Sequence, residues 1–317
     1  MDKYAKGDNS QSKGSVPHSS GTASSKGNYK SLFLLLRPRQ WTKNLVLFAG
    51  LIFSYNVFDL QLLSSSILAF FSFCLLSSSA YIINDIYDIN EDRAHPRKKC
   101  RPLAAKLVSV KEALILFIPL FIAALTLAWT INFYFALSAV AYFLIAICYT
   151  IWFKHIVIMD LFAISSGFLI RALAGALAIE VIVSPWFLFC ALLLSFFLAL
   201  TKRRQELVKL GDNRANYRKL LDHYPLPYLD QLISIVTAST LISYSLYTFT
   251  ASPTMLLMLT IPFVAYGIFR YLYLVYKVEI EDNPDELLLK DIPLVITIVS
   301  WALLSLIILA IENSSAI

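Results

Sequence analysis

The chain has 317 residues, of which 58% are hydrophobic and 15% are charged, and its formal net charge is +6. This composition argues against a soluble two-domain protein and predicts one integral membrane domain. The four cysteines form no CxxC pair, so we expect free thiols rather than a zinc site or a disulfide framework.

The first 28 residues are rich in Ser, Gly and Lys and contain no apolar stretch. We predict a disordered cytoplasmic tail over 1–28, and not a signal peptide, because an apolar h-region is missing. Residues 29–317 then form the transmembrane domain.

Apolar segments long enough to approach a membrane span recur along the rest of the chain. The predicted spans are 44–58, 64–84, 110–130, 134–152, 157–178, 184–200, 230–250, 255–276 and 291–311. Several connections are short, which favours antiparallel neighbours. The expected fold is therefore all-α, a bundle of nine transmembrane helices.

Lys and Arg concentrate in the tail and in every second loop, whereas the opposite loops contain no Lys or Arg and carry the acids Asp59 and Glu180. The positive-inside rule places the cation-rich side in the cytoplasm. We therefore expect a cytoplasmic N-terminus, an external C-terminus and a multi-pass protein of the cell (inner) membrane. Nearly all polar chemistry then faces the cytoplasm.

Three aspartates follow the second predicted span, in the sequence "NDIYDINEDRAHPRKKCRPLA". Asp85, Asp88 and Asp92 are spaced i, i+3 and i+7, which brings them within about 60° of one another on a helix. Such carboxylates repel one another unless a cation lies between them, and their oxygens suit Mg²⁺. Asn84 adjoins them. The simpler interpretation is an interfacial acidic loop neutralised by nearby cations.

A basic cluster follows directly, and Pro96 is expected to end the helix and turn the chain back over the acids. Metal together with Lys or Arg is a usual arrangement for holding a diphosphate. We favour a phosphate contact for Arg101, whereas Arg97 and Lys98 are better explained as orientation signals near lipid headgroups.

These residues resemble the first aspartate-rich motif of the UbiA-type intramembrane prenyltransferases. The stretches "LRPRQWTKNLVLFA", "YTIWFKHIVIMDLFAISSGFLIRALAGALA", "KRRQEL" and "FRYLYLVY" resemble the branch of that superfamily that transfers phosphoribose to decaprenyl phosphate. The resemblance runs from about Tyr29 to the C-terminus. It implies nine helices, a cavity facing the cytoplasm and dependence on Mg²⁺.

The reaction implied is transfer of 5-phosphoribose from phosphoribosyl diphosphate to a polyprenyl phosphate, with release of diphosphate. Asp85, Asp88 and Asp92 are the expected catalytic metal ligands, with Asn84 orienting the diphosphate. The expected partners are these two substrates and membrane lipids, with no nucleic acid; a homo-oligomer stays open. Cell-wall biosynthesis is the pathway that the resemblance suggests.

Several other residues are expected to contact substrate. Lys43 is a candidate phosphate ligand or a snorkelling anchor, and Tyr149 and Lys154 flank the turn after the fourth span. Asp160 lies near the cavity mouth. At the end of the sixth span, Lys202 and Arg203 are assigned to phosphate, with Glu206 orienting one of them.

Two charged residues are left undecided. Arg171 is eleven residues beyond Asp160, about 16 Å along a helix, so the two are not expected to pair. Asp291 lies in an acidic loop that is either solvated or a cap over the cavity.

Two competing functions use the same sequence features. An aromatic prenyltransferase that uses a polyprenyl diphosphate usually carries a second aspartate motif after helix six, where this chain has "TKRRQELVKL" instead. A transporter would carry charges across the whole membrane, whereas these charges cluster at one face and show no inverted repeat.

Overall fold

The computed structural model describes residues 25–54, 59–95, 98–182, 184–210, 220, 223–251, 254–277 and 290–315. Within these ranges the chain is helical, without strands, as predicted. The long helices are α1 Ser25–Leu35, α3 Leu60–Tyr87, α5 Val110–Ile131, α6 Phe133–Ile151, α7 Met159–Ala178, α8 Pro185–Leu210, α9 Leu226–Ala251, α10 Ile261–Tyr276 and α12 Ile292–Ser315. Shorter segments are η1 Pro38–Leu47, α2 Phe48–Phe53, α4 Ile89–Ala94, η2 Lys98–Cys100, η3 Phe153–His155 and η6 Leu256–Thr260.

Eight helical segments among the described residues are long and apolar enough to cross a membrane, and they match the second to ninth predicted spans. The first predicted span, 44–58, differs. Its described part is the end of the 3₁₀ segment η1 followed by the six-residue helix α2, and 55–58 lie outside the described residues. The count of nine and the cytoplasmic side of the N-terminus stay predictions.

Polar residues begin these helices at positions where the backbone needs partners, because the first N–H groups of a helix have none within it. The side chain of Asp59 accepts hydrogen bonds from the first turn of α3, and Ser109 and Glu112 form a capping box on α5. Asn132 caps α6 and also donates to the carbonyl of Leu177, at 2.8 Å, which ties the start of α6 to the end of α7.

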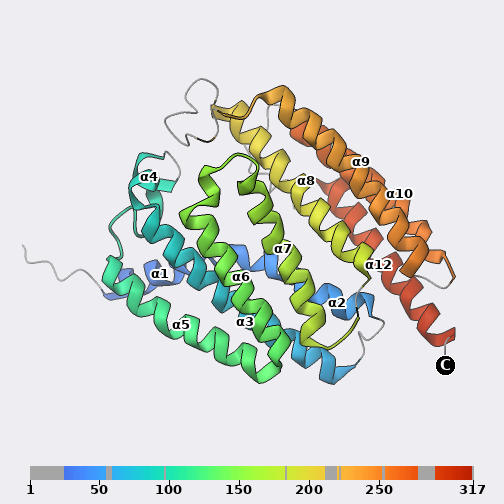
Figure 1. The fold of residues 1–317 in the computed structure, drawn as a ribbon, viewed down its shortest axis with the longest axis horizontal. Coiled ribbons are helices and arrows are strands. Elements are labelled where there is room, and N and C mark those ends of the chain that lie inside the picture. Colours follow the sequence, from blue (N-terminus) through green and yellow to red (C-terminus); the bar gives the residue numbers. More distant parts are fainter. Residues whose placement is uncertain are drawn as a thin grey trace, which may run out of the picture.

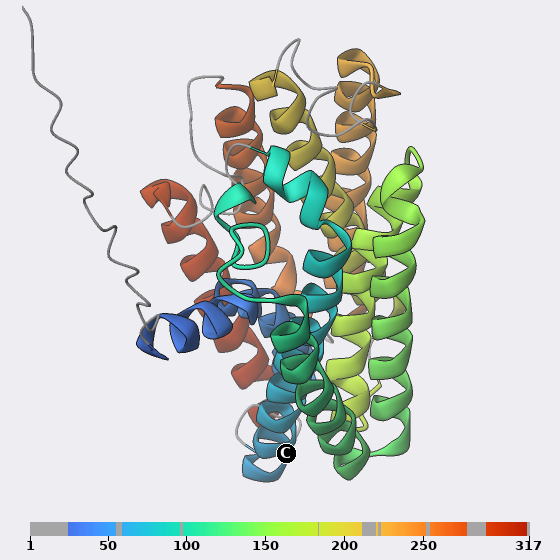
Figure 2. The same cartoon turned by 90° about the vertical axis from the view of Figure 1, so that its left-hand side faces the viewer.

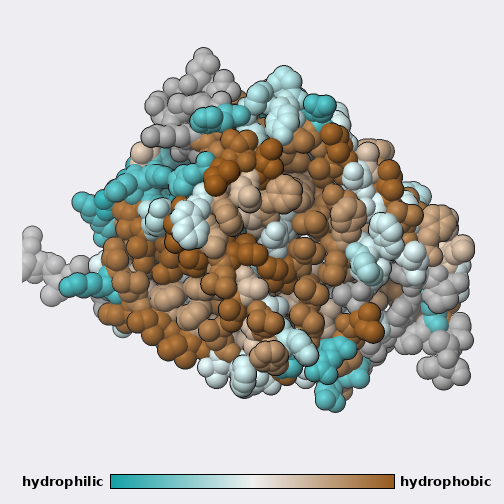
Figure 3. Space-filling model, in the orientation of Figure 1, coloured by the Kyte–Doolittle hydropathy of each residue, from teal (hydrophilic) through white to brown (hydrophobic). Residues whose placement is uncertain are grey.

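The helices pack as one bundle, with α3 against α5 and α6, and α8 against α9 (Figure 1). One apolar core cluster joins α3, α5, α6 and α7, and another joins α7, α8, α9 and α10. Figure 2 shows α4 and the C-terminal end at opposite ends of the bundle. The face seen in Figure 3 is mostly hydrophobic, and hydrophilic residues gather near α4, as expected for a bundle with lipid around its middle.

The segment η1–α2 lies unusually close to α7. A Cβ atom on Gly175 would be 2.0 Å from the carbonyl oxygen of Leu47, and a Cβ on Gly50 would be 2.9 Å from the backbone nitrogen of Ala176. Glycine at both positions lets the two backbones touch. This contact holds η1 across the interior of the bundle, where its polar residues meet the site.

α8 continues to Leu210, ten residues beyond the predicted end of the sixth span. Lys202, Arg203 and Glu206 therefore extend from the same helix that crosses the membrane. The tail predicted over 1–28 falls mostly outside the described residues, and α1 begins at Ser25 within that range.

Candidate active site

A cavity of about 440 Å³ opens among η1, α3, α6, α7 and α8, at the end of the bundle that carries α4. All of the predicted site residues line it except Asp85 and Asp160. The residues that do are Lys43, Asn84, Asp88, Asp92, Arg101, Tyr149, Lys154, Lys202, Arg203 and Glu206. Residues from four stretches far apart in sequence (43, 84–101, 149–154 and 202–206) therefore meet at one place.

Asp85 and Asp92 converge on one guanidinium group. Both residues are 2% exposed. The Nη1 atom of Arg101 is 3.2 Å from the Oδ1 atom of Asp85 and 2.6 Å from the Oδ2 atom of Asp92. Arg37 also pairs with Asp85. The predicted fold-back of the basic loop over the acids is thus present, and it brings Arg101 between two of them.

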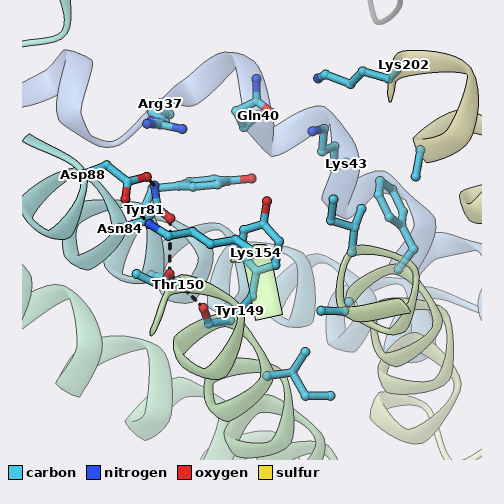
Figure 4. A pocket seen from close by; sticks show the side chains of 18 of the residues that line it. Arg37, Gln40, Lys43, Tyr81, Asn84, Asp88, Tyr149, Thr150, Lys154 and Lys202 are labelled. Atoms are coloured by element: carbon cyan, nitrogen blue, oxygen red, sulfur yellow. Dashed lines mark hydrogen bonds and ion pairs between the residues drawn. The ribbon is translucent and has the colours of Figure 1, made fainter. Parts of the chain in front are cut away.

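Asp88 turns to a different cation. It forms an ion pair with Lys154 of η3 and accepts a hydrogen bond of 3.0 Å from the Nδ2 atom of Asn84. The Oδ1 atom of Asn84 accepts in turn from Thr150, at 3.2 Å. Figure 4 shows this chain of contacts from α3 to α6 along one side of the pocket.

The three aspartates do not lie on one continuous helix. α3 ends at Tyr87, and Asp88 links it to α4 with backbone angles of φ −91° and ψ 7°. Within the described residues, no group of three or more His, Cys, Asp or Glu side chains is arranged to hold a metal ion. The predicted convergence of three carboxylates is therefore not present in this arrangement; two converge, and the metal role stays a prediction.

Arg203 is the centre of a second buried cluster. Its guanidinium is 2.6 Å from Asp160 and 2.6 Å from Glu206. Asp160 is fully buried and also accepts a hydrogen bond of 2.8 Å from Tyr224, whose pKa is raised by burial. Glu206 thus contacts Arg203, as expected, whereas Asp160 lies behind Arg203 and outside the cavity lining.

Lys43 and Lys202 reach the cavity from η1 and α8, and Figure 4 places both along the edge across from Asp88 and Lys154. Lys43 lies on η1, which packs against α7, and its role as phosphate ligand or anchor stays a prediction. The site therefore has an acidic side, where Asp85, Asp88 and Asp92 each face a cation, and a basic side.

Sequence reasoning missed several lining residues, including Arg37, Gln40, Tyr81, Tyr142 and Thr150. Tyr81 could have been found by continuing the Asn84–Asp88 stripe back by one turn of α3. Arg37 adopts a left-handed conformation, with φ 50°, and its guanidinium is 4.9 Å from the centre of the Tyr81 ring. Pro38 follows Arg37 and indicates an irregular backbone at Arg37, but it does not indicate the contact with Tyr81.

His95 lies at the cavity beside Lys98, whose backbone N–H donates to its Nδ1 atom at 3.3 Å. Burial, followed by the charge of Lys98, lowers the pKa of His95 below its usual value. The two residues left undecided by the sequence lie in different places. Arg171 lines the cavity, whereas Asp291 lies outside its lining and pairs with Arg270 at 2.8 Å.

Comparison with known proteins agrees with this arrangement. Residues 44–289 match the UbiA prenyltransferase family. The chain belongs to that family. A decaprenyl-phosphate phosphoribosyltransferase from Mycolicibacterium smegmatis is 34% identical over 292 residues, which cover 85% of this chain and 89% of the relative. The protein of the same name from Mycobacterium tuberculosis (strain CDC 1551 / Oshkosh) is 31% identical over 281 residues, with coverage of 84% and 90%.

Solved structures of the family share the fold. A UbiA homologue from Archaeoglobus fulgidus bound to GPP and Mg²⁺ aligns with a TM-score of 0.69 at 19% sequence identity, covering 88% of this chain and 99% of that one. The all-helical fold of the UbiA family predicted from the sequence is thereby confirmed. As a member of this family, the chain is a multi-pass membrane enzyme of the transferase class.

Proposed function

We propose that this protein transfers 5-phosphoribose from phosphoribosyl diphosphate to a polyprenyl phosphate. The observation that carries the proposal is the charge of the cavity lining. Eight Lys and Arg side chains line it: Arg37, Lys43, Lys98, Arg101, Lys154, Arg171, Lys202 and Arg203. Four acids line it: Asp88, Glu91, Asp92 and Glu206. This excess of cations suits two phosphorylated substrates better than one diphosphate and a neutral aromatic acceptor.

The names of the two curated relatives support the same pair of substrates. The position after the sixth span supports it too, because α8 brings Lys202 and Arg203 to the cavity together with the single acid Glu206. Arg203 is partly neutralised by Asp160 and Glu206. Lys43 and Lys202 are further candidates for a substrate phosphate because both line the cavity.

The carboxylates at the acidic side have the oxygen ligands that a divalent ion needs, although only two of them converge in this arrangement. Two buried carboxylates, Asp85 and Asp92, already surround one positive nitrogen of Arg101, and their oxygens are the ligands that Mg²⁺ prefers. With Asp88, they would hold Mg²⁺, which when bound supplies charge neutralisation to the diphosphate. Arg101 would then be released from the carboxylates toward the phosphate oxygens.

The proposed reaction depends more on aligning the acceptor phosphate with the C1 atom of ribose than on proton transfer. A phosphate oxygen of the acceptor forms a bond to the C1 atom of ribose, and the bond from C1 to the diphosphate oxygen breaks, with the electron pair leaving on diphosphate. The acceptor is already an anion near neutral pH and needs no strong general base. Arg37, Arg101 and Lys154 stand where charge develops on the leaving group, so they lower the barrier electrostatically.

The test uses purified protein with Mg²⁺, a polyprenyl phosphate and radiolabelled phosphoribosyl diphosphate, and measures the label extracted into organic solvent. We expect label with the wild type, none with Asp88→Ala, and wild-type levels with Glu180→Gln, an exposed acid outside the cavity lining. Omission of Mg²⁺ should abolish transfer. Absence of label, with alkylation of 4-hydroxybenzoate from a prenyl diphosphate, would overturn the proposal in favour of an aromatic prenyltransferase.

A further inference from the structure

Arg171 projects from the middle of α7 and is 5% exposed, yet it lines the cavity. Its guanidinium donates three hydrogen bonds, all to neutral oxygens. The acceptors are the side chain of Asn44 at 2.8 Å, the carbonyl of Gly167 at 2.9 Å and the hydroxyl of Tyr142 at 2.7 Å. The ring of Tyr142 also lies 4.5 Å from its carbon centre, so the group is enclosed by aromatic and backbone surface.

No carboxylate of the described chain forms an ion pair with Arg171, although other buried cations of the cavity have one. Arg203 has Asp160, and Lys154 has Asp88. A buried positive charge with neutral partners only is costly within a membrane protein. The three acceptors are neutral, so the contacts that tie η1 to α7 do not compensate the charge of Arg171. The charge therefore points to an anion that enters the cavity.

The guanidinium of Arg171 also has N–H donors left to bind that anion. Arginine has five N–H donors, and three of those of Arg171 are used, one on each nitrogen. The two that remain are on the terminal nitrogens Nη1 and Nη2. A pair of N–H groups on one planar fork matches two oxygens of a phosphate.

Arg171 lies deeper than the aspartates. It is eleven residues along α7 from Asp160, about 16 Å, and its partner Asn44 contacts Ser77, eleven residues before Asp88 on α3. A group bound at Arg171 is thus distinct from the diphosphate held by Asp85, Asp88 and Asp92. Gly167, one turn before Arg171, has no side chain, and a Cβ there would be in ordinary contact with the Nη1 atom of Arg171, at 3.5 Å.

We propose that Arg171 binds a phosphate monoester at the inner end of the cavity, with Asn44 and Tyr142 holding the guanidinium in place. The inference rests on the proposed function, in which two phosphate monoesters are present. One is the 5-phosphate of the ribose donor, and the other is the phosphate of the lipid acceptor. The chemistry at Arg171 is the same for both, and binding measurements separate them.

The experiment measures equilibrium binding to the purified protein in detergent, using three probes: ribose 5-phosphate, pyrophosphate and a short-chain polyprenyl monophosphate. The variants are Arg171→Gln, which removes the charge, and Arg171→Lys, which keeps the charge and loses the fork. Thermal midpoints of both variants verify folding. If Arg171→Gln does not fold, Arg171→Lys carries the test.

We expect Arg171→Gln to weaken one monoester by about 10- to 100-fold, in the range of a lost charge-assisted hydrogen bond, and to leave pyrophosphate within about twofold. Arg171→Lys should fall in between. Loss confined to ribose 5-phosphate identifies the sugar phosphate, and loss confined to the lipid identifies the acceptor.

Unchanged binding of both monoesters by the Arg171 variants would overturn this inference and leave the proposed transfer intact. An equal loss of all three probes would also overturn it, because it would mean that Arg171 acts only through the shape of the site. Wild-type protein that binds neither monoester would overturn the inference together with the proposed function.

Discussion

At the scale of single residues, the charges of the cavity are shared in an ordered way. Asp85 and Asp92 share Arg101, Asp88 has Lys154, and Asp160 has Arg203. The proposed phosphates and metal would therefore exchange partners with these pairs rather than enter an open site. Spacing in the sequence indicates which acids are near one another, but not which cation each acid selects, because the partners come from other helices.

Asp160→Asn tests the most buried of these pairs. The change leaves the guanidinium of Arg203, which is 4% exposed, without its fully buried carboxylate. Breaking a buried pair from one side costs about 3–5 kcal/mol. We expect a clear fall in the thermal unfolding midpoint of the protein in detergent.

The matched change is Glu206→Gln, which alters the other partner of Arg203. The side chain of Glu206 is 38% exposed, so we expect a loss of less than about 1 kcal/mol. Equal falls for the two variants would contradict a structural role for Asp160 and favour the direct substrate contact predicted from the sequence.

The pair of Asp291 and Arg270 gives a pH dependence. The hydrogen bond from Arg270 lowers the pKa of Asp291 below its usual value. A carboxyl group with a lowered pKa stabilises the fold above its unfolded-state pKa, and this contribution is lost as the pH falls through the folded-state pKa. Thermal midpoints of wild type and Asp291→Asn should therefore differ slightly near neutral pH and converge in acid. A constant difference down to pH values below about 3 would contradict this assignment.

At the scale of elements, eight of the nine predicted spans match long helices of the described chain. Each is a long apolar run with polar ends, and hydropathy depends little on tertiary contacts. Over 44–54 the described backbone is not one continuous helix, and this difference has a tertiary cause. η1 is a 3₁₀ segment after a left-handed residue, Arg37, and its place is set by the backbone contact of Leu47 with Gly175 on α7. Local sequence does not reveal that partner.

Two glycines of α7 allow this contact to be tested. Gly175→Ala would put a methyl group 2.0 Å from the carbonyl oxygen of Leu47, so η1 must move, together with Lys43 and Asn44. We expect a lower thermal midpoint and at least about tenfold weaker transfer, because small displacements of positioning groups are costly in catalysis.

Gly167→Ala is the matched control for stability. Its Cβ would meet the nearest atoms at 3.5 and 3.7 Å, which is ordinary contact, and alanine favours a helix by up to about 1 kcal/mol. The thermal midpoint should stay unchanged or rise. A similar fall for both variants would show that the Leu47 contact does not explain the sensitivity of α7.

At the scale of the whole molecule, α4 lies at one end of the bundle and the C-terminal helix ends at the other (Figure 2). Residues of α4 line the cavity, which places it at the α4 end. The cations that orient the protein and those that would bind phosphates are thus gathered on the same side. The proposed sugar diphosphate is soluble and would require that side to be cytoplasmic, whereas the proposed acceptor lipid would reach it from the bilayer.

Two thiol positions decide the orientation. Cys100 is exposed beside Arg101, and Ile182, in the connection between α7 and α8 at the opposite end, is 99% exposed. We expect a membrane-impermeant maleimide to label Cys100 in inverted membrane vesicles and not in intact cells. Ile182→Cys, in a Cys100→Ser background, should give the reverse.

The two labels together distinguish the possible outcomes. Labelling of Cys100 from outside intact cells, with protection of Ile182→Cys, would reverse the predicted topology and separate the site from a cytoplasmic sugar donor. Because the positive-inside rule depends on Lys and Arg near the spans, a reversed protein would also show that these cations serve the substrates rather than orientation. The expected pattern would mean that the same cations both orient the protein and bind the proposed phosphates. The positive-inside rule places these cations in the cytoplasm, and the proposed sugar diphosphate is also there.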